Sequence, residues 1–125
     1  MYAMVCTRPD LAFTLSRLSK FCSEPGKAHM QAARHALRYL RSTTTLGIVY
    51  KTQPKASKVI QMEGFSDSDF AADIDNRRST SGYVFTLNSS AISWKLKQQD
   101  LVTLSTMKAE YVGMTEACKE SVWLQ

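Results

Sequence analysis

The sequence predicts an α/β chain in which a helical hairpin precedes an antiparallel three-stranded sheet and a closing helix. Three observations lead to this prediction. Two helical patterns in the first 42 residues are separated by Pro25 and Gly26, which break helices. Strand-like runs rich in aromatic and β-branched residues follow between residues 59 and 96. Residues 105–124 then return to a helical period.

Composition allows a globular chain with a polyanionic partner. The 125 residues are 44% hydrophobic, which is ordinary for a folded protein, and the net charge of +5 suits a polyanion without requiring one. Three scattered cysteines without a CxxC pair indicate neither a disulfide framework nor a zinc site, and favour a reducing compartment. No apolar run is long enough to span a bilayer and no leader pattern is present, so we expect a soluble, intracellular protein and no membrane partner.

The hairpin is predicted from two apolar stripes. Residues 9–22 begin with Pro9 in the first turn, where its missing N–H costs nothing. Residues 27–42 follow the Pro25–Gly26 break. At helical spacing, the expected buried stripes are Leu11, Leu15, Leu18 and Cys22 in the first helix and Met30, Ala33, Leu37 and Leu40 in the second.

A row of cations lies beside the apolar stripe of the second helix. It consists of Lys27, Arg34, Arg38 and Arg41. Such a row can follow a phosphate backbone. It can equally be a solvated face whose long stems cover apolar surface. The composition changes from helix-forming to strand-forming residues over 43–58, so we place a domain division near residue 52, giving parts 1–52 and 53–125.

The next strand is expected over residues 59–70 and ends in aspartates. In an extended chain Asp67 and Asp69 share a face with Phe65. Two neighbouring carboxylates repel unless a cation or hydrogen-bond donors separate them, and Mg²⁺ is a natural partner. The alternative is an Asp-rich turn whose charge is neutralised by Arg77 and Arg78.

Two further runs, 82–88 and 91–96, predict a hairpin with its turn at 88–90. Both faces of the run at 82–88 are fairly apolar, which is typical of a central strand. Lys95 and Lys97 follow Trp94 and could contact a nucleic-acid backbone. The alternative is that Trp94 is core and the lysines solvate an exposed strand end.

The last helix is predicted from Ser105 to Leu124, with Ser105 or Thr106 as N-cap. Its expected apolar face consists of Tyr111, Met114, Cys118 and Val122. Glu110 lies about 100° from Tyr111, on the flank of that face, from which it could reach the end of a strand.

Four motifs together resemble a known family. The segments FSDSDFAAD, DNRRSTSGYVF, ISWK and LSTMKAEY occur in the order found in the ribonuclease H domain of Ty1/copia-type retrotransposon Pol polyproteins. The earlier stretches CTRPDLAFTLSRLSKF and HALRYLRST resemble the end of the preceding reverse transcriptase segment. The resemblance implies a helical reverse transcriptase end followed by an incomplete ribonuclease H-like fold.

The resemblance also implies a chemistry. Asp67 and Glu110 match the family's catalytic positions, and Mg²⁺, or Mn²⁺, would be held by Asp67, Glu110 and Asp69, of which Asp69 is not a catalytic position of the family. The expected substrate is an RNA–DNA hybrid, and the expected partner is the rest of the Pol polyprotein, in a cytoplasmic virus-like particle or the nucleus. Two further aspartates of the family's site have no match up to Gln125, so we expect weak or no activity from this piece. The alternative is a non-catalytic transposon-derived remnant that binds nucleic acid or protein, if it acts at all.

Overall fold

The computed structural model describes residues 2–50 and 61–125. The chain divides into two compact units, Met1–Ile48 and Val49–Gln125. The division that the sequence predicts near residue 52 lies outside the described residues.

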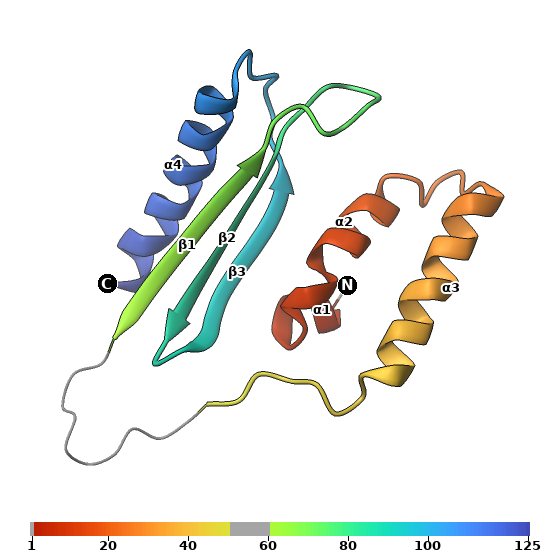
Figure 1. The fold of residues 1–125 in the computed structure, drawn as a ribbon, viewed down its shortest axis with the longest axis horizontal. Coiled ribbons are helices and arrows are strands. Elements are labelled where there is room, and N and C mark those ends of the chain that lie inside the picture. The colour runs from red at the N-terminus through yellow and green to blue at the C-terminus, as the bar shows by residue number, and fades with distance from the viewer. Residues whose placement is uncertain (1, 51–60) are drawn as a thin grey trace. The chain divides into compact units, whose positions relative to one another are not determined.

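The first unit is the predicted helical hairpin, with one helix more than expected. It contains α1 (Tyr2–Cys6), the 3₁₀ turn η1 (Pro9–Leu11), α2 (Ala12–Ser19) and α3 (Lys27–Ser42) (Figure 1). The first predicted helix, 9–22, is therefore a 3₁₀ turn followed by a shorter α-helix. Helix α3 has the bounds that the sequence predicts.

A buried guanidinium joins the two ends of this hairpin. Arg8 is only 7% exposed and donates to both carboxylate oxygens of Asp10 and, at 3.0 Å, to the carbonyl oxygen of Thr43 at the end of α3. Tyr39 of α3 donates its hydroxyl to the same Asp10 carboxylate at 2.8 Å. The Arg8 guanidinium lowers the pKa of Asp10 below its ordinary value.

The apolar stripe predicted for α3 is only half correct. Ala33 and Leu40 are partly buried, but Met30 and Leu37 are 49% and 66% exposed. Helix α3 has no fully buried residue, and its large apolar side chains at Met30 and Leu37 are mostly in solvent.

The second unit contains a three-stranded antiparallel sheet, as predicted. The strands β1 (Met62–Asp69), β2 (Thr80–Leu87) and β3 (Ser90–Gln98) pair in the order β1-β2-β3, with β2 in the centre. The predicted β2–β3 hairpin turns at Asn88 and Ser89, both at positive φ. Residues 59 and 60, which the prediction includes in the first strand, lie outside the described residues.

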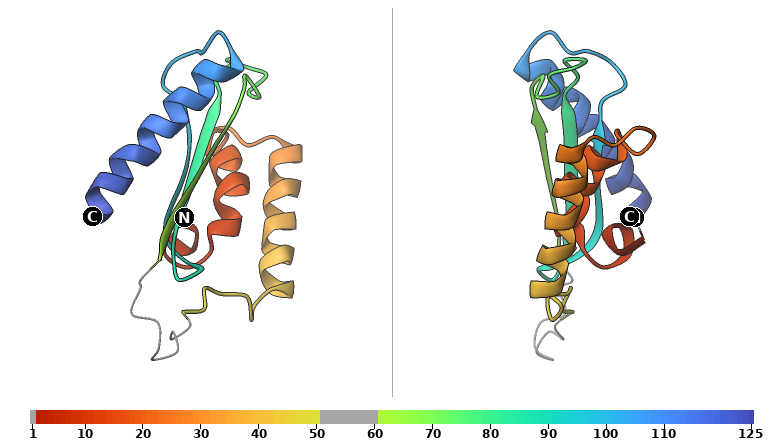
Figure 2. Two further views of the ribbon diagram at one scale, coloured as in Figure 1. Left: turned by 60° about the vertical axis from the view of Figure 1, so that its left-hand side comes forward. Right: turned by 90° about the vertical axis from the view of Figure 1, so that its right-hand side faces the viewer.

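Helix α4 (Thr106–Leu124) packs on one face of the sheet, against β1 and β2 (Figures 1 and 2). The predicted N-cap at Ser105 is confirmed, since its side chain accepts a hydrogen bond from the backbone N–H of Lys108.

The predicted packing face of α4 is wrong. The buried residues of the helix, which lie on its sheet-facing side, are instead small ones: Ala109, Gly113 and Ala117. A Cβ atom on Gly113 would lie 2.2 Å from Oγ of Ser68, so only glycine allows the helix this close to β1. The larger side chains of the predicted face point away from the sheet, among them Tyr111, which is 68% exposed.

Candidate functional site at the acidic strand end

The acidic run lies at the end of β1 and in the turn that follows it. Asp67 is an exposed residue of β1, paired with Gly82 on β2. The only hydrogen bond of its carboxylate within the described part of the chain is local, from the backbone N–H of Ser68 to Oδ1 at 2.9 Å. The Asp67 carboxylate therefore has unused acceptor positions facing solvent.

The next two aspartates have structural partners. Asp69 accepts a hydrogen bond from the backbone N–H of Thr80, at the start of β2. Asp73 is 3% exposed and accepts from the backbone N–H of Asp75 and, at 2.6 Å, from Nε2 of Gln98. These bonds hold the connection between β1 and β2. Asp69 and Asp73 therefore stabilise a turn, which is the alternative interpretation of the Asp-rich run in the sequence.

Strand alternation separates the residues of β1 onto two faces. Ser68 faces α4, because its hydroxyl lies beside Gly113 and bonds that of Ser81 at 2.9 Å. Asp67 and Asp69 therefore face away from α4, together with Phe65 as predicted.

Glu110 lies in the second turn of α4, between the buried Ala109 and Gly113. Its side chain is exposed and has no hydrogen bond or ion pair to another described residue. Gly113, less than one turn further on, contacts β1 at Ser68, the neighbour of Asp67. The structure therefore brings the two predicted elements together, but it places Asp67 and Glu110 on different sides of β1.

Carboxylate oxygens are the ligands that Mg²⁺ prefers, so Asp67 and Glu110 are the right type of residue to bind the ion. Two such residues are fewer than a two-ion metal site needs. Over residues 2–50 and 61–125 there is no group of three or more His, Cys, Asp or Glu side chains placed to hold a metal ion. Two carboxylates are too few for the two-ion site that the resemblance implies.

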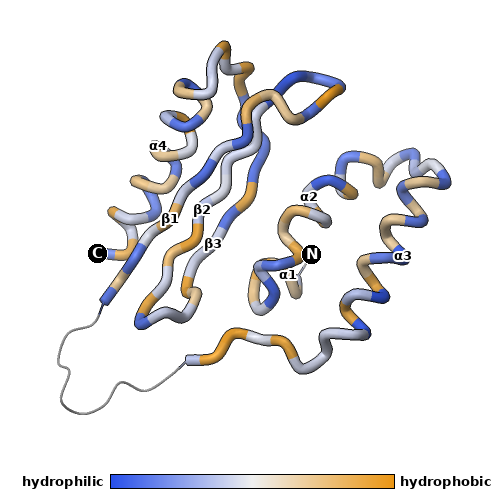
Figure 3. Tube along the Cα trace, viewed as in Figure 1, coloured by the Kyte–Doolittle hydropathy of each residue, from blue (hydrophilic) through white to orange (hydrophobic). Residues whose placement is uncertain are grey.

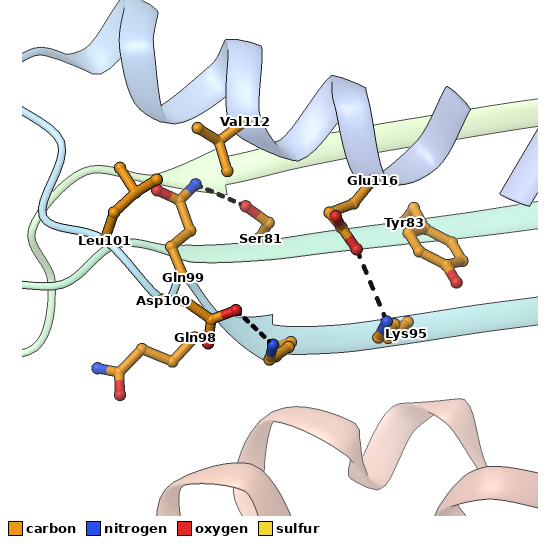
Figure 4. Close-up of a pocket in the computed structure, with 10 residues that line it drawn as sticks. Ser81, Tyr83, Lys95, Gln98, Gln99, Asp100, Leu101, Val112 and Glu116 are labelled. Atoms are coloured by element: carbon orange, nitrogen blue, oxygen red, sulfur yellow. Dashed lines mark hydrogen bonds and ion pairs between the residues drawn. The ribbon is translucent and has the colours of Figure 1, made fainter. Parts of the chain in front are cut away.

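The two lysines predicted to bind nucleic acid, Lys95 and Lys97, line a pocket. This pocket, of about 160 Å³, lies between α4 and the α4-facing side of β2 and β3 (Figure 4). Lys95 pairs with Glu116 at 3.8 Å and Lys97 pairs with Asp100 at 2.8 Å. These carboxylates partly neutralise the two lysine charges. Trp94 precedes Lys95 in the strand, so its side chain lies on the opposite face of the sheet.

Sequence reasoning missed the polar residues that join α4 to the sheet. Gln99 is 5% exposed and donates through Nε2 to Oγ of Ser81 at 2.7 Å and to the carbonyl oxygen of Ala109 at 2.9 Å. Tyr83 lies in the same layer, and burial, followed by the nearby Glu120 and Glu116 carboxylates, raises its pKa to about 12. The even spacing of Ser81 and Tyr83 along one strand is the only sequence signal for their shared face.

The predicted cations of α3 form an open surface in the first unit. Arg34, Arg38 and Arg41 are exposed, and none of them forms an ion pair with another described residue. Arg34 and Arg38 line a groove with Lys27, Met30 and Gln31. Residues 1–48 hold seven Lys and Arg against two Asp and Glu, so the whole net charge of +5 belongs to this unit.

No helix in the described part of the chain combines the length and the apolar character needed to cross a bilayer. No family model matches the chain, and no solved structure matches it. Named relatives do match it along nearly its whole length.

Secreted RxLR effector protein 161 of Plasmopara viticola is 48% identical over 99% of this chain and 84% of its own length. The retrovirus-related Pol polyprotein from transposon TNT 1-94 of Nicotiana tabacum is 47% identical over the whole chain, which spans 9% of that polyprotein. The corresponding polyprotein from transposon RE1 of Arabidopsis thaliana is 36% identical over 94% of the chain, or 8% of the polyprotein. This similarity runs through both units, including the motifs that end β1 and begin α4, and the chain therefore belongs to the Ty1/copia-type family of retrovirus-related Pol polyproteins from transposons.

Proposed function

We propose that this chain is a segment of a transposon Pol polyprotein that supplies two carboxylates to a metal-dependent ribonuclease H site. The reaction is hydrolysis of the RNA strand of an RNA–DNA hybrid during reverse transcription. The observation that carries the proposal is the state of Asp67: an exposed carboxylate with free acceptor positions, at the end of an edge strand, next to the helix that carries Glu110.

The aspartates of the acidic run differ in what they can offer a ligand. Asp69 and Asp73 already accept backbone and side-chain hydrogen bonds that hold the β1–β2 connection. Asp67 accepts one local bond and faces solvent. This difference supports Asp67 as the ligand within the FSDSDF motif and supports a positioning role for Asp69.

The edge of β1 is the place where the site would be completed. Within residues 61–125, β1 pairs only with β2, so its second edge is open. Asp67 lies on β1 itself, and α4, the helix that carries Glu110, packs against β1. Mg²⁺ or Mn²⁺, when bound, would activate water and stabilise the leaving oxygen. Asp67 and Glu110 contribute negative charge and oxygen donors, and further acidic ligands are needed from elsewhere in the polyprotein.

We expect this chain alone to hydrolyse hybrid weakly or not at all, because two carboxylates balance the charge of one divalent ion at most. The test is release of labelled RNA from an RNA–DNA hybrid by the purified chain in Mg²⁺ or Mn²⁺. Robust hydrolysis by the chain that disappears in Asp67→Asn would contradict the expectation and would show that the site is complete.

A second candidate function is a free-standing, non-catalytic module that binds nucleic acid or protein. It is supported by the effector relative, a separate protein whose length this chain nearly covers. The same assay discriminates the two candidates when it is run on a longer Pol polyprotein that contains this segment. Hydrolysis there that depends on Asp67 supports the enzyme, whereas hybrid binding without hydrolysis supports the module.

The basic face of α3 would hold the nucleic acid in either case. Arg34, Arg38 and Arg41 are exposed, unpaired within the described residues, and belong to the unit that carries the whole net charge. Lys95 and Lys97 are weaker candidates because each forms an ion pair with a carboxylate, that of Glu116 or Asp100. We place this function inside the cell, where reverse transcription of a transposon occurs.

A further inference from the structure

The outer face of α4 is apolar and uncovered within the described residues. Met107 is 79% exposed, Tyr111 68%, Met114 52% and Val122 72%, and Cys118 between them is exposed as well. Apolar positions recur along the whole helix in the hydropathy view (Figure 3). These five residues, which we call the outer seam, lie opposite the small residues that contact the sheet.

The spacing of the outer seam is that of a helix that packs on another helix. Leu104, just before α4, and then Met107, Tyr111, Met114 and Cys118 follow one another at alternating steps of three and four residues. This is the repeat by which two helices interlock their side chains. A single-helix partner would therefore fit the seam along its length.

The two ends of the seam have complementary shapes. At the N-terminal end a groove of about 440 Å³ is lined mainly by apolar side chains, including Leu101, Leu104, Met107 and Tyr111. At the C-terminal end the exposed side chain of Val122 projects from the helix. Met114 lies midway between Met107 and Val122, so a two-fold axis there would place each Val122 over the groove of the other helix.

We propose that two copies of this chain associate through the outer seam, with their α4 helices antiparallel about a two-fold axis near Met114. A two-fold pairing presents the same patch from both subunits, and it is the commonest symmetry of soluble oligomers. The exposed parts of Leu104, Met107, Tyr111, Met114 and Val122 amount to roughly 600–700 Å² per copy, close to the ~800 Å² per partner of a stable interface. The pairing covers side chains that are otherwise exposed apolar surface of the second unit.

The oligomeric state of the wild-type chain tests this proposal. Sedimentation velocity over a concentration series should give a dimer, and Met114→Glu should raise the dimer dissociation constant at least tenfold, because two carboxylates would meet at the two-fold axis. The matched control is Ile74→Glu, which changes an 82% exposed apolar residue of the same unit outside the seam. This control should leave the dimer intact. A monomeric wild type, or a dimer that Met114→Glu leaves unchanged, would overturn the proposal.

Cysteine cross-linking tests the direction of the helices. In an antiparallel pair Cys118 lies level with Tyr111 of the other copy, about 10 Å along the axis from the second Cys118. With Cys6 and Cys22 replaced by Ser, Cys118 should therefore not form a disulfide between copies. Met114→Cys with all three natural cysteines replaced should form one readily. Cross-linking through Cys118, or none through Met114→Cys, would contradict the antiparallel arrangement.

Discussion

Asp67 and Asp69 differ in what each does for the fold. We expect Asp69→Ala to lower the free energy of unfolding by about 1–3 kcal/mol, because it leaves the backbone N–H of Thr80 without its acceptor. Asp67→Ala should stay within about 0.5 kcal/mol of wild type, as is usual for exposed residues. Urea unfolding of the three proteins measures both effects. Equal losses in the two variants would contradict the division of roles between these aspartates.

Tyr83 should make the stability of the second unit depend on pH at the alkaline end. Burial raises its pKa in the folded chain to about 12, above the ordinary value of 10. A raised pKa means that the neutral phenol stabilises the fold below about pH 10 and that this contribution is lost as the pH rises towards 12.

An absorbance titration of the phenolate checks this expectation. The difference between wild type and Tyr83→Phe should show one tyrosine titrating with a midpoint near pH 12. A midpoint at the ordinary value would mean that solvent reaches the hydroxyl in solution.

At the scale of elements, the sequence predicted the helices and strands better than their faces. The bounds of α3 and α4 and the β2–β3 hairpin follow from Gly, Pro, Ser and aromatic residues at the expected positions. The buried face of α4 was not predicted, because Ala109, Gly113 and Ala117 are less hydrophobic than the large apolar residues on the opposite face. The four-residue spacing of these small residues was the signal in the sequence that could have identified the face. Small residues pack against a sheet by allowing close approach, which a hydrophobic pattern does not record.

Gly113 provides the test of this close approach. Helix propensity alone would make Gly113→Ala stabilising by about 1 kcal/mol. The clash of the new Cβ with Oγ of Ser68 should instead give a net loss of about 1–3 kcal/mol. Adding Ser68→Gly should recover part of the loss in urea unfolding. Gly82→Ala, whose Cβ would make ordinary contacts, is the control and should cost less. Stabilisation by Gly113→Ala would mean that α4 lies further from β1.

At the scale of the whole molecule, charge is segregated between the units. Residues 1–48 carry +5, while residues 49–125 hold nine basic and nine acidic residues and are neutral. The sequence predicted the basic row of α3 but not the partners of Lys95 and Lys97. Glu116 lies on α4, so only the folded chain brings it near Lys95, whereas Asp100 is three residues after Lys97 and could have been considered from the sequence.

This segregation predicts which cations respond to salt. If α3 contacts phosphates, the joint replacement Arg34→Gln and Arg38→Gln should reduce the slope of log affinity against log salt by about 1.8 for duplex nucleic acid. Lys95→Gln with Lys97→Gln, a change of equal charge, should alter the slope less. Filter binding at several salt concentrations measures both. A larger change from the lysine pair would assign the contact to the second unit.

The most direct test of the proposed function is hydrolysis of a labelled RNA–DNA hybrid by a longer Pol polyprotein that contains this segment. We predict that Asp67→Asn and Glu110→Gln each reduce RNA release at least a hundredfold in Mg²⁺ while DNA synthesis by the same polyprotein continues. Hydrolysis at the wild-type rate in both variants would contradict the account.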